Sequence, residues 1–321
     1  MKTDKVDYTG NHPENNNNWE RSMLEKLLLE VYREQRRTRI WRWVWRLLWI
    51  VVFLMFINTL TSTKSEMTVK GSHSAVIDLT GVIDNETNQA DLLREGLKEA
   101  YKDKNVKGII IRANSPGGSP AISSIAYQEI RYLKTKNPKI PVYVVVEDMC
   151  ASGCYYIASA ADKIFADPSS LVGSIGVIGS SFDFTGLIDK LGVKRRVKIA
   201  GNNKGMGDPF VPETPEQQQI WQQMLTSIHN QFINAVKQGR GARLKDSHNP
   251  DVFSGRVYTG EEAKTVGLID DFGNIYTISR DIIGAPQIVN YTPDTKWSKL
   301  IGRKFSSEIQ QNLENMTNKP W

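Results

Sequence analysis

Beyond residue 70 the chain alternates short apolar, β-branched runs with longer segments of helical period, and this alternation limits the possible folds most. Short apolar runs are typical of buried strands, and the segments between them have the length and period of helices. No internal repeat and no Pro/Ser-rich linker divides this part of the chain, so one α/β domain is predicted over residues 75–285. The strands are expected at 75–83, 106–112 and 141–147, and the helices at 88–101 and 120–134.

The same pattern continues toward the C-terminus in shorter elements. Thr259 and Glu262 have the spacing of a capping box and predict a short helix that ends at Gly267. Further helices are expected at 154–161, 185–191 and 214–239, and further strands at 163–166, 171–178 and 193–199.

An apolar run upstream of this domain predicts a membrane anchor. Leu47 to Ile57 is uninterrupted but short, and tryptophans alternate with arginines just before it. A span of ~20 residues results if Arg42 and Arg46 extend toward the headgroups and the tryptophans lie at the interface. A buried core helix would hardly carry this Trp/Arg alternation, and a long segment precedes the run, which disfavours a cleaved signal peptide. We therefore expect a transmembrane helix over 39–61.

Charge on the two sides of this run predicts its orientation. Six arginines lie between residues 33 and 46, whereas only Lys64 and Lys70 follow soon after the run. The positive-inside rule then makes residues 1–38, with an amphipathic helix over 19–37, a cytoplasmic tail in contact with lipid or a neighbour. The remaining segments are a linker over 62–74 and a C-terminal extension over 286–321.

Overall charge and cysteine count exclude several classes of protein. The chain has 41 Lys+Arg and 35 Asp+Glu. Ten of the basic and seven of the acidic residues precede residue 62, so the rest of the chain has 31 basic and 28 acidic residues. This near-neutral body argues against nucleic acid as a partner. Cys150 and Cys154 are too few for a disulfide framework, and no further Cys or clustered His completes a metal set, so neither metal nor cofactor is expected. Because a bridge between them must close a very short loop, packing is the favoured role of these cysteines.

Three glycine-rich stretches at expected strand ends are candidates for chemistry: NSPGGS (114–119), CASGC (150–154) and VGSIGVIGS (172–180). Ser152 lies where a strand passes into a helix, which suits a nucleophile and also an ordinary N-cap. Gly117 and Gly118 leave backbone N–H groups beside a helix start, which suits an oxyanion site and also a tight turn. The lysine of a phosphate loop is absent after these glycines.

A serine nucleophile needs a base. The four histidines, His12, His73, His229 and His248, all lie outside the glycine-rich stretches, and His229 is expected on an exposed helix face. A Ser-His-Asp triad is therefore possible but unsupported. A buried lysine is the alternative, because burial lowers the pKa of an amine and lets it accept the serine proton.

Four ordered segments resemble the signal peptide peptidase A (SppA) family of serine proteases, peptidase family S49. The resemblance extends over residues 75–280 and is carried by NSPGG, ASGCYYIASAADKIFADPSSLVGSIGVIG, GNNKGMGDPF and GRVYTGEEAKTVGLIDDFG. It implies the fold of Clp protease and crotonases, built of repeated ββα units, and a Ser-Lys dyad.

The resemblance also implies roles for individual residues. The nucleophile falls on Ser152, the general base on Lys204, and a serine that orients the base on Ser174. Gly153 is expected to join Gly117 or Gly118 in an oxyanion hole, because its N–H lies at a helix start. Two positions depart from the family pattern: Cys154 replaces a glycine, and Asp208 replaces a serine and places a carboxylate four residues from the lysine, which favours the charged amine.

The function expected is that of a single-pass, membrane-anchored serine endopeptidase of the bacterial inner membrane, with its catalytic domain in the periplasm. Its expected substrates are short hydrophobic peptides such as cleaved signal peptides, and the resemblance implies a ring of identical protomers. A crotonase-type acyl-CoA enzyme is an alternative, but the membrane segment and Lys204 argue against it. A non-catalytic membrane scaffold is a further alternative, weakened by the presence of both serines and the lysine.

Overall fold

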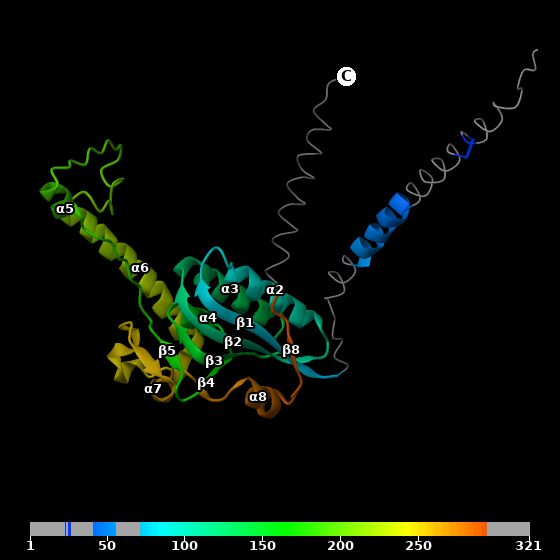
Figure 1. Ribbon diagram of the computed structural model, residues 1–321. Helices are drawn as coiled ribbons and strands as arrows, with labels where there is room; N and C mark the ends of the chain where they lie inside the picture. The colour runs from blue at the N-terminus through cyan, green and yellow to red at the C-terminus, as the bar shows by residue number, and fades with distance from the viewer. Residues whose placement is uncertain (1–22, 24, 27–40, 56–70, 294–321) are drawn as a thin grey trace, which may run out of the picture. The chain divides into compact units, whose positions relative to one another are not determined.

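The computed structural model describes residues 23, 25–26, 41–55 and 71–293. The chain divides into two compact units, residues 1–68 and 69–321, which are described separately. In the first unit, residues 41–55 are helical with exposed side chains (Figure 1). Among the described residues, no helix combines the length and hydropathy that a membrane crossing requires. The described residues cover only parts of the expected tail (1–38), anchor (39–61), linker (62–74) and C-terminal extension (286–321), so the rest of these segments lies outside the described residues.

A single eight-stranded sheet forms the centre of the second unit. Its strands run in the order β6-β5-β3-β2-β1-β8, and β4 pairs with both β3 and β7. All pairs are parallel except β5 with β6. The strands are β1 (His73–Ile83), β2 (Val106–Gly118), β3 (Val142–Ala151), β4 (Lys163–Ala166), β5 (Leu171–Gly173), β6 (Val257–Thr259), β7 (Asp271–Phe272) and β8 (Ile288–Asn290).

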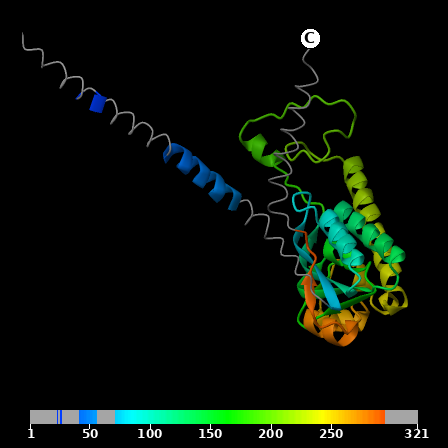
Figure 2. The same cartoon turned by 90° about the vertical axis from the view of Figure 1, so that its right-hand side faces the viewer.

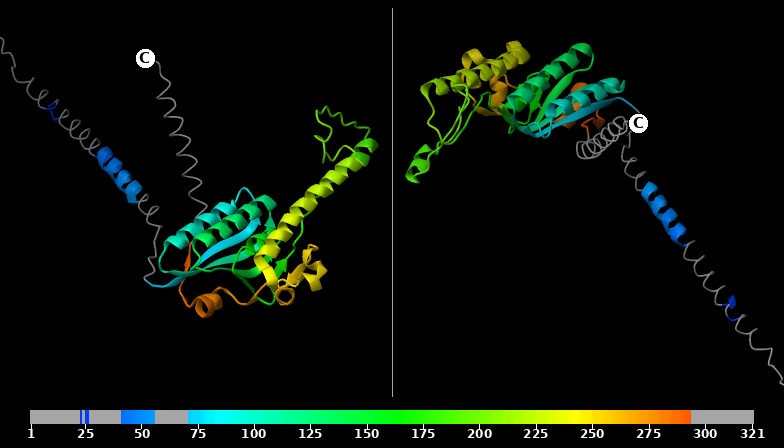
Figure 3. Two further views of the ribbon diagram at one scale, coloured as in Figure 1. Left: turned by 180° about the vertical axis from the view of Figure 1, so that it is seen from behind. Right: turned by 90° about the horizontal axis from the view of Figure 1, so that it is seen from above.

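Helices cover both faces of this sheet, as the predicted α/β pattern requires. On one face lie α2 (Gln89–Lys102), α3 (Pro120–Lys136) and α4 (Gly153–Ala158), and the other face meets α8 (Ile275–Thr277) and a π-helical turn at Ile278–Ile283 (Figures 1 and 3). Successive residues of the central strands alternate between the two cores. Ile109 and Ile111 pack on the larger core, whereas Ile110 packs on the smaller one.

A long helix forms an arm that projects from the sheet. This helix, α6 (Pro215–Arg240), begins with a capping box between Thr214 and Gln217, and its C-terminal part packs on the large core. The short helix α5 (Thr185–Lys190) and the loops around it lie at the far end of the arm (Figures 1 and 2). The last helix, α7 (Gly260–Val266), has the predicted Thr259–Glu262 capping box and ends at Gly267 with φ 83°.

Two predicted strands differ in the structure. Residues 193–199 form no strand, because no strand among the described residues of the chain pairs with them to complete a ladder, and Val193 and Ile199 stay exposed. The strand predicted over 171–178 ends at Gly173, where the chain leaves the sheet with φ 104°. In contrast, β2 and β3 extend beyond their predicted ends and carry the chain directly into the glycine-rich turns.

Candidate active site

Ser152 links the end of β3 to the start of α4. Its backbone has φ 52° and ψ −122°, a conformation rare for any residue except glycine. Its N–H donates a 2.8 Å hydrogen bond to the carbonyl oxygen of Gly173, and its carbonyl oxygen accepts one of 3.0 Å from the N–H of Tyr156. Its side chain caps no N–H of α4, so an ordinary N-cap does not explain this serine. A strained residue of this kind is typical of a functional position.

Three glycines pack tightly around this serine. A Cβ added to Gly117 would lie 2.8 Å from the Ser152 Cβ and 2.7 Å from the Gly153 nitrogen, so a larger residue does not fit. A Cβ on Gly153 would lie 3.2 Å from the Gly118 nitrogen, which places these two backbone amides close together. The N–H of Gly117 already donates to the Ser115 Oγ at 3.1 Å. Gly118 and Gly153 are therefore the better candidates for oxyanion donors, and Gly117 contributes close packing.

Ser174 lies on the adjacent strand end. It follows Gly173, the residue that accepts the Ser152 hydrogen bond, and its own backbone has φ 50°. Its N–H donates to the carbonyl oxygen of Arg256 at 2.8 Å, which ties it to the antiparallel neighbour of β5. The parallel pairing of β3 with β5 therefore brings two strained serines to one edge of the sheet.

A cavity of about 540 Å³ opens at this edge. Ser152, Ser174 and Gly118 line it together, although they come from three different glycine-rich stretches. Its wall combines apolar and polar residues. Its lining residues are Pro116, Gly118, Pro120, Ser152, Ser174, Gly176, Val177, Ile178, Ser254 and Gly255. The sequence analysis did not single out Ser254 and Gly255 as site residues; a Ser-Gly dipeptide is a general turn signal and could have pointed to a loop there.

Lys204 does not line this cavity. It is exposed in the loop between α5 and α6, at the far end of the arm, and its N–H donates to the Gly201 carbonyl oxygen at 3.0 Å. The structure therefore brings Ser152 and Ser174 together in one chain but not Lys204.

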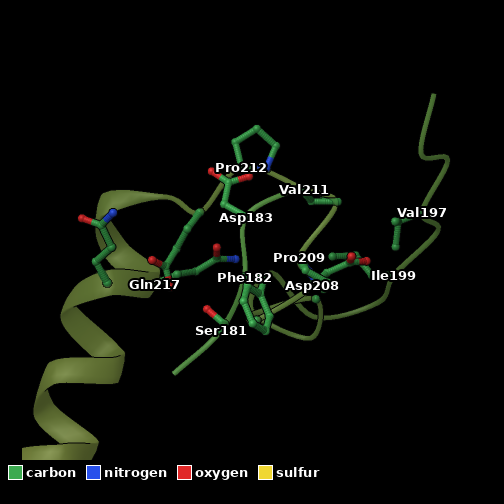
Figure 4. A pocket seen from close by; sticks show the side chains of 14 residues that line it. Ser181, Phe182, Asp183, Val197, Ile199, Asp208, Pro209, Val211, Pro212 and Gln217 are labelled. Atoms are coloured by element: carbon green, nitrogen blue, oxygen red, sulfur yellow. The ribbon is translucent and has the colours of Figure 1, made fainter. Parts of the chain in front are cut away.

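A second cavity, of about 360 Å³, lies at the end of the arm, with Phe182, Ile199 and Asp208 among its lining residues (Figure 4). Asp208 accepts hydrogen bonds from the Phe210 N–H at 3.0 Å and from Arg195 at 3.0 and 3.2 Å. The bond from the Phe210 amide, followed by that from Arg195, lowers the pKa of Asp208. The Asp208 carboxylate thus pairs with Arg195 and not with Lys204, the base that the family resemblance implies.

None of the three described histidines lines the Ser152 cavity. His229 is half-buried on α6, not exposed as expected, and its Nε2 lies 3.1 Å from the Ile175 carbonyl oxygen. His73 is buried at the start of β1 with its Nε2 2.9 Å from the Tyr291 hydroxyl. His248 contacts the side chain of Ser247. Within the described residues, no group of three or more His, Cys, Asp or Glu side chains is placed to hold a metal ion.

Cys150 and Cys154 form a disulfide, which corrects the expectation that they are packing residues alone. Their Cα atoms lie 5.1 Å apart, within the range that a disulfide spans. The turn at Ser152 reverses the chain between the end of β3 and the first turn of α4, and this reversal brings the two side chains together despite the short loop. Sequence spacing alone did not show this reversal.

Several known proteins are similar to this chain. A family model described as peptidase family S49 matches residues 134–282. A putative protease of Synechocystis sp. is 31% identical over 62% of this chain and 69% of its own length. A putative signal peptide peptidase SppA of Enterococcus faecium is 36% identical over 55% of this chain and 50% of its own length. A protein of Brucella melitensis named Na(+)/H(+) antiporter NhaA is 46% identical over 59% of this chain, which spans only 25% of that protein.

This chain is an α/β protein with a glycine-lined cavity at the edge of its sheet, and its relatives include proteins named as proteases. The chain belongs to peptidase family S49 and is of the SppA type.

Proposed function

We propose that this chain is a membrane-anchored serine endopeptidase that cleaves short hydrophobic peptides such as cleaved signal peptides. The observation that carries the proposal is the position of Ser152, strained and free of a capping role, beside Ser174 and the Gly118 and Gly153 amides. The proposal includes the assignment of this chain to the fold of Clp protease and crotonases, which is built of repeated ββα units. The substrate class is supported by the name of the Enterococcus faecium relative and by the apolar residues in the cavity wall.

In the proposed mechanism a neutral Lys204 amine accepts the proton of the Ser152 hydroxyl, and the Oγ attacks the scissile carbonyl carbon. The developing oxyanion accepts hydrogen bonds from the backbone N–H groups of Gly118 and Gly153. When the tetrahedral intermediate collapses, the protonated lysine gives its proton to the leaving amine, and an acyl-enzyme remains on Ser152. Water then attacks this ester, with the lysine again acting as base. Ser174 is proposed to accept a hydrogen bond from Lys204 and hold it in place.

We further propose that the lysine comes from a neighbouring copy in a ring of protomers. Within one chain Lys204 lies at the end of the arm and not in the Ser152 cavity. Large apolar side chains near the arm's end are exposed, including Phe182 at 76% and Leu191 at 68%, which is costly in water and supports burial against another copy. An arm docked on the adjacent protomer would bring the lysine to the serine and bury this apolar surface.

The proposed location places the catalytic unit outside the cytoplasm of a bacterial inner membrane. Two features support it: the arginines concentrated before the apolar run, and the Cys150–Cys154 disulfide, since disulfides persist in oxidising compartments.

A serine-directed fluorophosphonate tests the central assignment. The purified chain should react at one serine, and mass spectrometry of its peptides should place the adduct on Ser152. Ser152→Ala should abolish both the adduct and peptide cleavage. The matched control Ser180→Ala, which changes a serine outside the Ser152 cavity lining, should retain both. An adduct on another serine, or cleavage by a folded Ser152→Ala protein, would contradict the proposal.

A further inference from the structure

The Cys150–Cys154 disulfide spans the turn that carries Ser152. Cys150 is the penultimate residue of β3, where it is paired with Ser115 of β2 and Val172 of β5, and Cys154 is the second residue of α4. Both cysteine side chains are fully buried in the large core. The bridge therefore ties the beginning of the helix to the centre of the sheet, with Ser152 midway between its two ends.

Close packing of the neighbouring glycines and two backbone hydrogen bonds also hold this turn. Its main chain is fixed by the Ser152 N–H bond to Gly173 and the Tyr156 N–H bond to the Ser152 carbonyl oxygen. The Ser152 side chain adds no cap, and its backbone conformation is intrinsically unfavourable. Such a conformation persists only where the surroundings over-determine it. The disulfide is the covalent part of those surroundings.

We infer that this disulfide positions the nucleophile for attack, so that reduction lowers the reactivity of Ser152 while the domain stays folded. This inference rests on the proposed function. Reduction removes the covalent tether between the end of β3 and the start of α4, so the two ends of the turn can move apart. The turn is closely packed, because a Cβ added at Gly117 would lie 2.8 Å from the Ser152 Cβ and one added at Gly153 would lie 2.5 Å from the Ser123 Oγ.

A small shift at this position has a large chemical effect. Displacement of a catalytic group by about 1 Å costs on the order of 10²-fold in rate. The walls of the cavity, such as Pro116 and Val177, lie outside the bridged loop and stay in place. The inference thus predicts a fall in kcat with KM little changed. A purely stabilising disulfide would instead change the unfolding midpoint and leave the rate of the folded enzyme unaltered.

The test measures the rate at which a fluorophosphonate labels Ser152 in the full chain, before and after reduction by a dithiol. The dithiol gives two electrons, the S–S bond becomes two thiols, and the dithiol itself becomes a disulfide. Alkylation followed by mass spectrometry counts the thiols formed. We expect labelling to slow by about one to two orders of magnitude and to recover on reoxidation. Circular dichroism should show a folded protein throughout.

Two variants separate positioning from stability. Cys150→Ala/Cys154→Ala should label slowly without any reductant, lower kcat more than it raises KM, and show no response to dithiol. Ile157→Val, a change in the same buried helix, should lower the unfolding midpoint but label at the wild-type rate. Unchanged labelling in the fully reduced chain, or in the double variant, would overturn the inference. Free thiols at both cysteines in the purified protein would also overturn it.

Hydrogen exchange separates this inference from the proposed function. If the oxidised chain takes no label on Ser152, the serine-protease assignment fails, and exchange at residues 151–156 still reports on the bridge. Faster exchange of these amides in the reduced chain and in the double variant supports positioning by the disulfide. Equal exchange in the oxidised and reduced chains contradicts it.

Discussion

The backbone N–H of Ser152 donates a 2.8 Å hydrogen bond to the carbonyl oxygen of Gly173, the residue directly before Ser174. Together with the parallel pairing of β3 and β5, this bond links the strand ends that carry the two serines. Gly173 has φ 104°, and a Cβ there would lie 3.1 Å from the Tyr258 ring and 3.2 Å from the Arg256 carbonyl oxygen.

Gly173→Ala should therefore disturb the site through the backbone. We expect a loss of about 1–3 kcal/mol in the free energy of unfolding, because alanine is strained at this φ, and a larger proportional loss of peptide cleavage. Urea unfolding and cleavage rates measure the two effects. Gly186→Ala in α5 is the matched control, since an added Cβ there meets no atom within 4 Å. Wild-type cleavage by Gly173→Ala would show that the link between β3 and β5 does not matter for activity.

A dyad shared between copies predicts complementation. Ser152→Ala chains retain Lys204, and Lys204→Ala chains retain Ser152, so a mixture of the two should regain part of the activity that each lacks alone. Sedimentation of the second unit alone should show an oligomer. Cleavage by mixed chains, after dissociation and reassembly, is the measurement. A mixture as inactive as its parts, or a fully active monomer, would place the base within the same chain.

A lysine base predicts a characteristic pH profile. The amine must be neutral to accept the serine proton, so activity should rise toward mildly alkaline pH. Lys204→Arg keeps the charge but does not release its proton at these pH values, so a folded variant should be as inactive as Ser152→Ala. Ser174→Ala should cause a smaller loss, because the base remains present. Normal cleavage by Lys204→Arg, or inactivity of a folded chain lacking all four histidines, would favour a histidine base.

The ion pair between the buried Arg240 and the partly buried Asp270 predicts a stability that depends on pH. Arg240 is 2% exposed and donates to Asp270 at 2.6 Å, which fixes the end of α6 to the sheet. Burial raises the pKa of Asp270, but the hydrogen bond and charge of Arg240 outweigh it and leave the pKa below its ordinary value. Because its pKa is lower in the folded state, Asp270 adds stability at pH values above its unfolded pKa of about 3.9. This stability is lost as the pH falls through the folded pKa.

Asp270→Asn should accordingly destabilise the chain by about 3–5 kcal/mol at pH 7, because it leaves the Arg240 charge buried without a counterion. The difference from wild type in the free energy of unfolding should narrow below about pH 4. Urea unfolding over a pH series provides the measurement. Asp271→Asn, which removes an exposed pair with Lys264, should have little effect at any pH. A difference that stays constant down to pH 2 would argue against an ionised Asp270 as the cause.

The arginine distribution predicts the membrane topology. A reporter active only outside the cytoplasm should work when fused after residue 321 and fail when fused before residue 20. A reporter active only in the cytoplasm should give the reverse result. An inverted pattern for both reporters would contradict the positive-inside argument.

Local patterns in the sequence were sufficient for the main elements of the second unit. The apolar runs became β1, β2 and β3, because their side chains have a core to enter on both faces. Glycine and serine at the strand ends marked the turns that line the cavity, because only small residues fit there. The resemblance in four ordered segments gave the family, which the comparisons confirm.

The relations between distant segments were decided only by the tertiary structure. Ser152 and Gly173 meet because β3 and β5 pair in parallel, and no local pattern fixes that register. The disulfide depends on how sharply the chain reverses at Ser152. The failure of 193–199 to form a strand depends on the absence of a partner strand in the part of the chain that the structure describes. The position of Lys204, outside the Ser152 cavity, depends on the direction of the arm. The sequence by itself determined which residues have the right chemistry, whereas packing and strand pairing decided which of them meet.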